Sequence, residues 1–305
     1  VRRQMQYLGQ DNNLDLSAYS EDVTEGTVTV QMDQTWSNKV SIGALDRTLS
    51  FDRYSEMVLK PMARRAAERV EASIAALYTN FYWFDGTPGT IPATYSAIAD
   101  AGAIFTDGGN AMGGRLGFHS PAASAKLAAL IQGTYVDGNN KKALEMAKVG
   151  RYAGFDNYET VFAPTHTVGT LGGTPLVNGG AQAVTYATAK DTWSQSLITD
   201  GWTAAAANRL KAGDVFTIAN VFAVNPNTKV STGRLQTFTV LSDAASDGSG
   251  NLTATISPPI IISGAFQTVN AQPADNAALT IKTGSSATAY RQSLLLDPMA
   301  IALVS

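Results

Sequence analysis

The feature that most constrains the fold is one long helical pattern between residues 51 and 81. Apolar side chains recur there every three or four residues, which places them on one side of a helix. Pro61 is tolerated in the first turn of a helix but disrupts a helix interior. We therefore expect a short helical lead-in, a break near Lys60 and then a helix of roughly 18 to 20 residues. Taken alone, the pattern is typical of an amphipathic core helix. The apolar stripe consists of Tyr54, Val58, Met62, Ala66, Val70, Ile74, Leu77, Tyr78 and Phe81.

Two β-like runs precede this helix, at residues 1–9 and 27–45, and a polar stretch separates them. Apolar residues alternate with polar ones in the second run, for example at Val28 and Val30 and again at Val40. The pattern predicts a long two-stranded arm with a polar tip. Because an isolated hairpin is marginal in water, the arm should lie on its own domain or on a neighbouring subunit.

An α/β pattern follows the long helix. A helix is expected near 96–109 and a short buried strand begins at Leu116. Ser120 followed by Pro121 has the residue types that start a helix. Another short helix is expected over 141–149, and the run 150–164 carries strand-forming residues punctuated by glycine, as at a sheet edge.

From Thr167 the chain becomes rich in Gly, Thr, Ala and Val, and no convincing helix is predicted before residue 287. Short β-like runs separated by turn residues suggest a small antiparallel barrel or sandwich of about 120 residues. The apolar residues after Tyr290 resume the interrupted domain, so the β unit is expected to be an insertion. The predicted strands are AVTYAT (183–188), SQSLITD (194–200), DVFTIANVFAVN (214–225), LQTFTVLSD (235–243), LTATISPPIII (252–262) and ALTIKTG (278–284).

Little in the chain points to catalysis. Cysteine is absent, and His119 and His166 are its two histidines. His119 lies at a strand-to-helix junction with no second ligand at metal spacing, which favours a hydrogen-bonded structural role. The chain contains no GxSxG, P-loop or HExxH motif. We expect no catalytic residue, no metal site and no cofactor.

A calcium loop is the one metal site that the sequence suggests. Asp243, Asp247 and Asn251 carry oxygen ligands within a short stretch. However, Asp and Asn beside glycine mark turns far more often, and the final Glu of an EF-hand loop is missing. A turn is the preferred interpretation.

Two other classes of protein remain open from the residues alone. A carbohydrate-active enzyme could stack sugars on tryptophan and use paired carboxylates. A tail-tube or decoration protein would share the β-rich, cysteine-free composition, but a helix as long as the one near 51–81 argues against it. The tryptophans concerned are Trp36, Trp83, Trp193 and Trp202.

The order of these parts resembles the major coat proteins of tailed double-stranded DNA phages with the HK97 fold, and more narrowly the phage P22 coat-protein family. That family carries an inserted antiparallel β-barrel. The most specific similarity is LKAGDVFTIANVFAVNPNTK (210–229), with its Gly-Asp turn, followed by LQTFTV and NLTATISPPII. The GxxxGF segment from Gly150 to Phe155 and the final LLLDPMAIALVS extend the likeness over the whole chain.

The resemblance implies an α+β, HK97-type capsid fold with five parts. Because the family has further segments before and after this stretch, both ends are expected to be cut short. The implied parts are residues 1–48 as an E-loop-like β arm, 49–82 as the spine helix of the peripheral domain, 83–167 as an axial-type α/β domain, 168–287 as the β-barrel insertion domain and 288–305 as the return into the axial and peripheral domains.

The function that the resemblance implies is that of a major capsid protein, which is structural and not enzymatic. It would assemble in the host cytoplasm into pentamers and hexamers of an icosahedral virion shell. Scaffolding protein and portal would be partners. Contact with packaged double-stranded DNA would be non-specific, because the net charge is −3 and no basic cluster is present. No membrane partner is expected, since no run of 18 apolar residues occurs. Deleting residues 11–25 should leave the subunit folded but impair shell formation.

Overall fold

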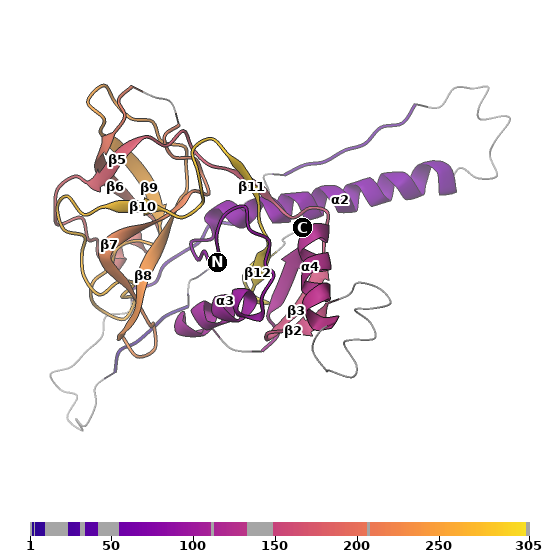
Figure 1. Ribbon diagram of the computed structural model, residues 1–305, viewed down its shortest axis with the longest axis horizontal. Helices are drawn as coiled ribbons and strands as arrows, with labels where there is room; N and C mark the ends of the chain where they lie inside the picture. Colours follow the sequence, from indigo (N-terminus) through magenta and orange to yellow (C-terminus); the bar gives the residue numbers. More distant parts are fainter. Residues whose placement is uncertain are drawn as a thin grey trace.

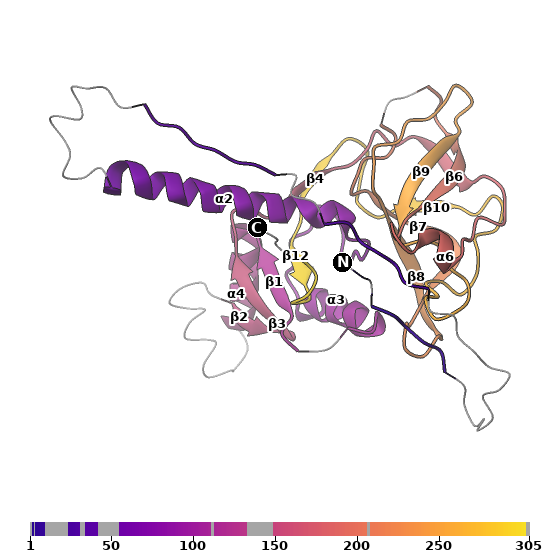
Figure 2. The same ribbon diagram turned by 180° about the vertical axis from the view of Figure 1, so that it is seen from behind.

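The computed structural model describes residues 2, 4–9, 24–30, 34–41, 55–110, 113–132, 149–205 and 208–302. Within these residues the chain forms two sheet-based bodies that lie side by side, and a long helix runs out from them (Figures 1 and 2). The described part of the chain is therefore of mixed α and β structure, as predicted.

The long helix begins with a π-helical turn, η2 (Ser55–Leu59), and continues as α2 (Lys60–Ala76) and the 3-10 turn η3 (Leu77–Asn80). The predicted lead-in is confirmed, but the predicted break near Lys60 is wrong. Leu59 keeps helical angles, with φ −69° and ψ −43°, and Pro61 lies at the start of α2. Proline is compatible with this position because the first N–H groups of a helix have no partner inside the helix. The chain changes its hydrogen-bonding pattern at the proline and stays helical.

The surface of α2 is the second departure from expectation. None of its residues is buried, although the apolar stripe is that of a core helix. Val70 is 44% exposed and Leu77, just beyond α2, is 41% exposed. Figure 1 shows the reason, since α2 projects well beyond both sheets. The interpretation of this segment as an ordinary core helix is therefore wrong for the single subunit.

A four-stranded sheet forms the first body, with strand order β12-β1-β3-β2. β1 runs parallel to β3 and antiparallel to β12. The predicted strand at Leu116 and the helix beginning at Pro121 are both present, and the Ser120 hydroxyl accepts a hydrogen bond from the Ala123 amide (3.3 Å). The elements are β1 (Leu116–His119), β2 (Gly150–Tyr152), β3 (Phe155–Glu159), β12 (Leu294–Leu296), α3 (Tyr95–Asp107) and α4 (Pro121–Gln132).

A compact apolar core joins the two helices to this sheet. Phe155 on β3 is fully buried, and the ring of Phe105 on α3 packs edge-on against it with 5.7 Å between centroids. Leu127 on α4 completes the contact. The opposite face of the sheet carries Phe118 and Tyr158, which stack on each other.

A six-stranded antiparallel sheet forms the second body, with strand order β10-β7-β8-β9-β6-β5. Its end strands meet at one bridge between Leu176 and Ala278, so the sheet is nearly closed. Its core contains Phe216, Ile218 and Phe238, all fully buried. The strands are β5 (Gly173–Val177), β6 (Gln195–Trp202), β7 (Val215–Val224), β8 (Ser231–Val240), β9 (Leu252–Ser257) and β10 (Leu279–Ile281).

One predicted strand of this body is wrong. The run 183–188 contains part of a short helix, α6 (Tyr186–Ala189), in place of a strand. Thr185 is extended and α6 begins directly after it, so that the Tyr186 ring stacks on Phe266 with 3.7 Å between centroids. Tertiary packing of one aromatic side chain outweighs the local β preference here.

A two-stranded ribbon connects the bodies. β4 (Thr165–Thr167) pairs antiparallel with β11 (Ala289–Arg291), so the chain enters the six-stranded sheet and leaves it at the same place. It then returns to the first sheet as β12, which pairs antiparallel with β1. The residues from 297 to 302 form turns and irregular backbone, not the strand that their apolar pattern suggests.

The predicted two-stranded arm is reduced to one pairing among the described residues, the bridge between Arg2 and Thr27. Val28, Val30 and Val40 are all exposed. With no apolar surface of the same subunit beneath them, strands in this segment gain little from pairing. The arm tip and residues 141–148 of the helix predicted over 141–149 lie outside the described residues.

Candidate functional site

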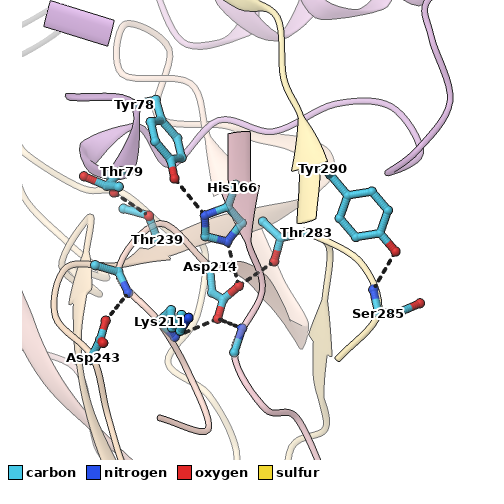
Figure 3. A network of polar contacts seen from close by, with 12 residues as sticks. Tyr78, Thr79, His166, Lys211, Asp214, Thr239, Asp243, Thr283, Ser285 and Tyr290 are labelled. Atoms are coloured by element: carbon cyan, nitrogen blue, oxygen red, sulfur yellow. Dashed lines mark hydrogen bonds and ion pairs between the residues drawn. The ribbon is translucent and has the colours of Figure 1, made fainter. Parts of the chain in front are cut away.

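The most extensive buried polar contact in the described chain lies where the long helix, the β4–β11 ribbon and the six-stranded sheet meet. Figure 3 shows this junction, in which Tyr78 and Thr79 come from η3, His166 from β4 and Thr239 from β8, while Asp214 directly precedes β7. We refer to the contacts among Tyr78, His166, Asp214 and Thr283 as the polar junction.

Asp214 is the centre of the polar junction and is completely buried. Its Oδ1 accepts from His166 Nε2 (2.9 Å) and from the Thr283 hydroxyl (3.0 Å). Its Oδ2 accepts from the backbone amides of Gly169 (3.1 Å) and Lys211 (2.7 Å). An ionised carboxylate has about four acceptor positions, so every one is used. Because all of its acceptor positions are hydrogen-bonded, the carboxylate of Asp214 can be buried without a large energetic penalty.

The carboxylate also determines the tautomer of His166. Because an ionised Asp214 can only accept, Nε2 of His166 carries the proton. Nδ1 then accepts from the hydroxyl of Tyr78, at 3.0 Å. Burial, and to a smaller extent the negative charge of Asp214, raise the pKa of the Tyr78 hydroxyl above its ordinary value, which keeps it as a donor.

A second contact holds the end of the helix to the sheet. The hydroxyl of Thr239 on β8 donates to the carbonyl of Thr79, at 2.9 Å. Gly213 lies between these parts with φ +92°, and a Cβ there would be 3.0 Å from Thr79 Cγ2 and 3.2 Å from His166 Cε1. The close approach of three chain segments therefore requires glycine at this position.

The polar junction has the residue types of a proton relay, but His166 is 1% exposed and Asp214 is 0% exposed. Substrate could not reach the pair, because neither side chain is exposed to solvent. Nor do three His, Cys, Asp or Glu side chains converge on a metal-sized space anywhere in the described part of the chain. The arrangement fixes the six-stranded sheet relative to the long helix, which is a structural function.

His119 has the structural role that the sequence predicts. It is buried, and its Nε2 lies 2.8 Å from Oδ1 of Asn157. The amide nitrogen of Asn157 donates to the carbonyls of Gly150 and Phe155, so Nε2 of His119 must be the donor. Burial lowers the pKa of His119, and the hydrogen bond that its ring donates to Asn157 opposes this only in part. The pair ties β1 to the β2–β3 hairpin.

The suggested calcium ligands form a turn. Asp247 Oδ1 accepts from the amides of Ser249 and Asn251, each at 2.8 Å, and Oδ2 accepts from the Asn251 side chain at 3.0 Å. These bonds hold the pKa of Asp247 below its usual range. Asp243 points elsewhere and accepts from the Ala212 amide (3.0 Å). The carboxylates do not converge on one point.

The tryptophans do not form a sugar platform either. Trp202 is buried and donates to the Thr199 hydroxyl, at 2.9 Å. Trp83 packs on Phe105 of α3. Trp193 and Trp83 both line a cavity of about 460 Å³ between the two bodies, and Trp36 is exposed on the arm. The four tryptophans therefore lie in different surroundings and do not form one shared surface.

Sequence reasoning missed the polar junction. The Gly-Asp turn is recognisable in the sequence, but no neighbouring residue marks His166 as more than an available imidazole. The local signal for this site is the position of Asp214, which follows a glycine and directly precedes an apolar strand. A carboxylate at that position is expected to be buried. Tyr78, Thr239 and Thr283 carry no local signal, because ordinary helix and strand residues look the same.

A buried polar junction, a long helix with no fully buried residue and arm valines that are exposed are features typical of an assembly protein. The model of the family described as P22 coat protein, gene protein 5, matches residues 4–302. The chain therefore belongs to the P22 coat protein family. It is a phage major capsid protein that forms the shell of the virion, which excludes the enzyme, tail-tube and decoration alternatives.

Two solved structures are similar to parts or most of the chain. The CUS-3 coat protein I-domain is 28% identical, covers 38% of this chain and 99% of its own, and gives a TM-score of 0.26. A subunit of the asymmetric unit of the bacteriophage PhiM1 mature capsid is 14% identical, covers 95% of this chain and 79% of its own, and gives a TM-score of 0.37. No curated protein sequence matches the chain. None of the helices in its described part has the length and apolar character that spanning a bilayer requires.

Proposed function

We propose that the subunit builds the shell in the manner of an HK97-type capsid protein. Residues 1–48 would form the arm that covers a neighbour, 49–82 the spine helix and 83–167 the axial-type domain. Residues 168–287 would be an inserted β-barrel domain, and 288–305 the return. The nearly closed six-stranded sheet and the β4–β11 ribbon at its base support the insertion.

The observation that carries this proposal is the exposed apolar surface of the long helix. No residue of α2 is fully buried, and Val70 on α2, Leu77 on η3 and Val30 on the arm are each more than 40% exposed. A monomer rarely leaves such a surface uncovered, whereas a shell subunit buries it against neighbours. Repeated contacts of this kind would hold pentamers and hexamers together.

Replacing Val70 by Lys tests the proposal. Because Val70 is already half exposed, the variant should fold as the wild type does by circular dichroism. It should fail to form shells under electron microscopy, since a charge would be buried at the contact. The matched control is Ile198→Lys, which places the same charge on an exposed apolar position of β6. Normal shells from Val70→Lys would contradict the assignment of α2 as a contact surface.

The remaining partners follow from the family likeness. Scaffolding protein and portal would act during assembly in the host cytoplasm. The inner wall would contact packaged DNA weakly and without sequence preference, because a chain of net charge −3 neutralises few phosphates. A gel shift that resists salt and selects a sequence would contradict this expectation.

A further inference from the structure

Among the described residues, Thr27 of the arm makes a well-defined contact with Asp191 of the six-stranded body, 164 residues further along the chain. Asp191, just after α6, accepts two hydrogen bonds from Thr27 through a single oxygen. The Thr27 amide lies 2.8 Å from Asp191 Oδ1 and the Thr27 hydroxyl lies 3.0 Å from it. Arg2 bridges to Thr27 as well, and its guanidinium pairs with Glu25 at 3.1 Å. Both described strands of the arm therefore meet at this point.

Steric fit makes the contact selective. A Cβ on Gly26 would lie 2.6 Å from the backbone carbonyl oxygen of Lys190 and 3.1 Å from the hydroxyl of Tyr186. The carbonyl is part of the backbone and cannot move aside as a side chain would. Only a glycine lets the arm approach closely enough for Thr27 to reach Asp191.

The receiving surface is ordered by its own aromatic packing. The Tyr186 ring lies parallel to Phe266, with 3.7 Å between centroids and 5° between planes. Trp193 packs edge-on against both rings. A surface whose side chains are already ordered loses little entropy when a segment docks on it.

Charge completes the fit. The second oxygen of Asp191 lies 2.8 Å from the Lys190 ammonium. The hydrogen bonds from Lys190 and from Thr27 hold the pKa of Asp191 at about 2. A lowered pKa means that the contact is complete above the ordinary carboxyl pKa and is lost only as the pH falls through about 2. Asp191 is thus ionised at neutral pH and can accept these hydrogen bonds.

We infer that Tyr186, Lys190 and Asp191 form a docking surface for Gly26 and Thr27, and that this contact fixes the direction in which the arm leaves the subunit. Asp191 is then a positioning residue for arm placement in the shell. The inference rests on the proposed function of residues 1–48 as an arm, but the docking itself exists in the unassembled subunit and is measured there.

Hydrogen exchange of the Thr27 amide in unassembled full-length subunits tests the docking. Asp191→Ala should speed exchange at Thr27 by about tenfold or more, because a charge-assisted hydrogen bond is lost. Asp191→Asn keeps an acceptor and should have a smaller effect. The matched control is Asp275→Ala, another exposed carboxylate of the same body, which accepts from the Gly179 amide at 2.8 Å. Equal exchange at Thr27 in wild type and Asp191→Ala would overturn the docking.

Two variants on the arm make the result independent of any change in the sheet. Thr27→Val removes only the hydroxyl donor, and Gly26→Ala introduces the Cβ that meets the Lys190 carbonyl. Both should also speed exchange at residue 27, and Gly26→Ala should have the larger effect. Wild-type exchange in Gly26→Ala would contradict the steric part of the inference.

Assembly separates this inference from the proposed function. Asp191→Ala should yield fewer or irregular shells by sedimentation and electron microscopy, while Asp275→Ala forms shells as the wild type does. Regular shells from Asp191→Ala with a freely exchanging Thr27 amide would overturn the positioning role. Failure of the wild type itself to form shells, with Thr27 protected, would instead refute the proposed function and leave the docking intact.

Discussion

The imidazole of His166 lies 2.9 Å from the carboxylate of Asp214, with both side chains buried between the long helix and the six-stranded sheet. Forty-eight residues separate the two in sequence. The contact fixes the base of the six-stranded body where the chain enters it, and so determines how that body is oriented on the helix. The contribution of this contact to the free energy of unfolding can be measured with variants of Asp214.

Asp214→Ala should destabilise the subunit strongly. The substitution leaves the His166 Nε2 proton, the Thr283 hydroxyl and two backbone amides without their acceptor. We expect a loss of roughly 3–5 kcal/mol in the free energy of unfolding, measured by urea denaturation. Asp243→Ala, which removes an exposed acceptor of one amide, should cost less than about 1 kcal/mol. Equal losses in the two variants would contradict the central position of Asp214.

Asp214→Asn should be much milder and should reverse the tautomer of His166. The amide oxygen can accept from the Gly169 and Lys211 amides while its nitrogen faces His166 and Thr283. Nε2 of His166 must then accept, so Nδ1 takes the proton and donates to Tyr78. Nitrogen-15 chemical shifts of the imidazole report this change directly. An unchanged Nε2–H tautomer would show that Asp214 does not determine the protonation of His166.

Tyr78→Phe should cost about 1 kcal/mol at neutral pH, because Nδ1 of His166 loses its donor. Burial, then the charge of Asp214, raises the pKa of Tyr78 above 10.0, so the fold favours the neutral phenol. The stabilisation is therefore complete below the unfolded pKa and is lost as the pH rises through the folded one. The free energy of unfolding of the wild type and of Tyr78→Phe should be measured by urea denaturation across this pH range. The difference between the two should be constant near neutrality and shrink above pH 10. A difference that grows in alkali would contradict it.

His119 should make the wild type sensitive to acid. Burial lowers its pKa below 6.5, so the fold favours the neutral ring. This contribution is complete above the unfolded pKa and is lost as the pH falls through the lower folded value. His119→Gln keeps an N–H donor for Asn157 and does not titrate. The stability of the wild type should therefore fall relative to that of His119→Gln between pH 7 and pH 5, and an NMR titration of the ring should show the lowered pKa directly.

Elements with a strong local pattern could be predicted from the sequence. The long helix, the Ser120-Pro121 helix start and most strands of the six-stranded sheet have periodic apolar residues of sufficient length. β4, β11 and β12 are each three residues long, which is too short for a clear apolar pattern. β5 lies in a glycine-rich run with a bulge after Gly173, so its pattern is also unclear. The role of His119 was also predictable, because its neighbours at the strand-to-helix junction offer no ligands.

The contacts that hold the bodies together could not be predicted in this way. Tyr78 and His166 are 88 residues apart, and Thr27 and Asp191 are 164 apart. Such pairs depend on how whole elements pack, and each residue type involved is common on ordinary surfaces. The exposure of α2 could not be predicted for a related reason, since an apolar stripe indicates that something covers it but does not say whether that is the same subunit.

Gly213→Ala tests how closely the three segments of the polar junction must approach. Gly213 has φ +92°, which disfavours any residue with a Cβ, and that Cβ would also crowd Thr79 and His166. We expect a loss of about 1–3 kcal/mol in unfolding free energy, with weaker protection of Tyr78 and its neighbours in hydrogen exchange. Gly233→Ala is the matched control, because Gly233 has φ +74° and nothing within 4 Å of its position for a Cβ. It carries the backbone strain without the crowding, so the difference between the two variants isolates the contact between the helix end and the sheet. If the two losses are equal, the close packing at Gly213 contributes nothing, and the orientation of the six-stranded body must depend on Asp214 and Thr239 alone.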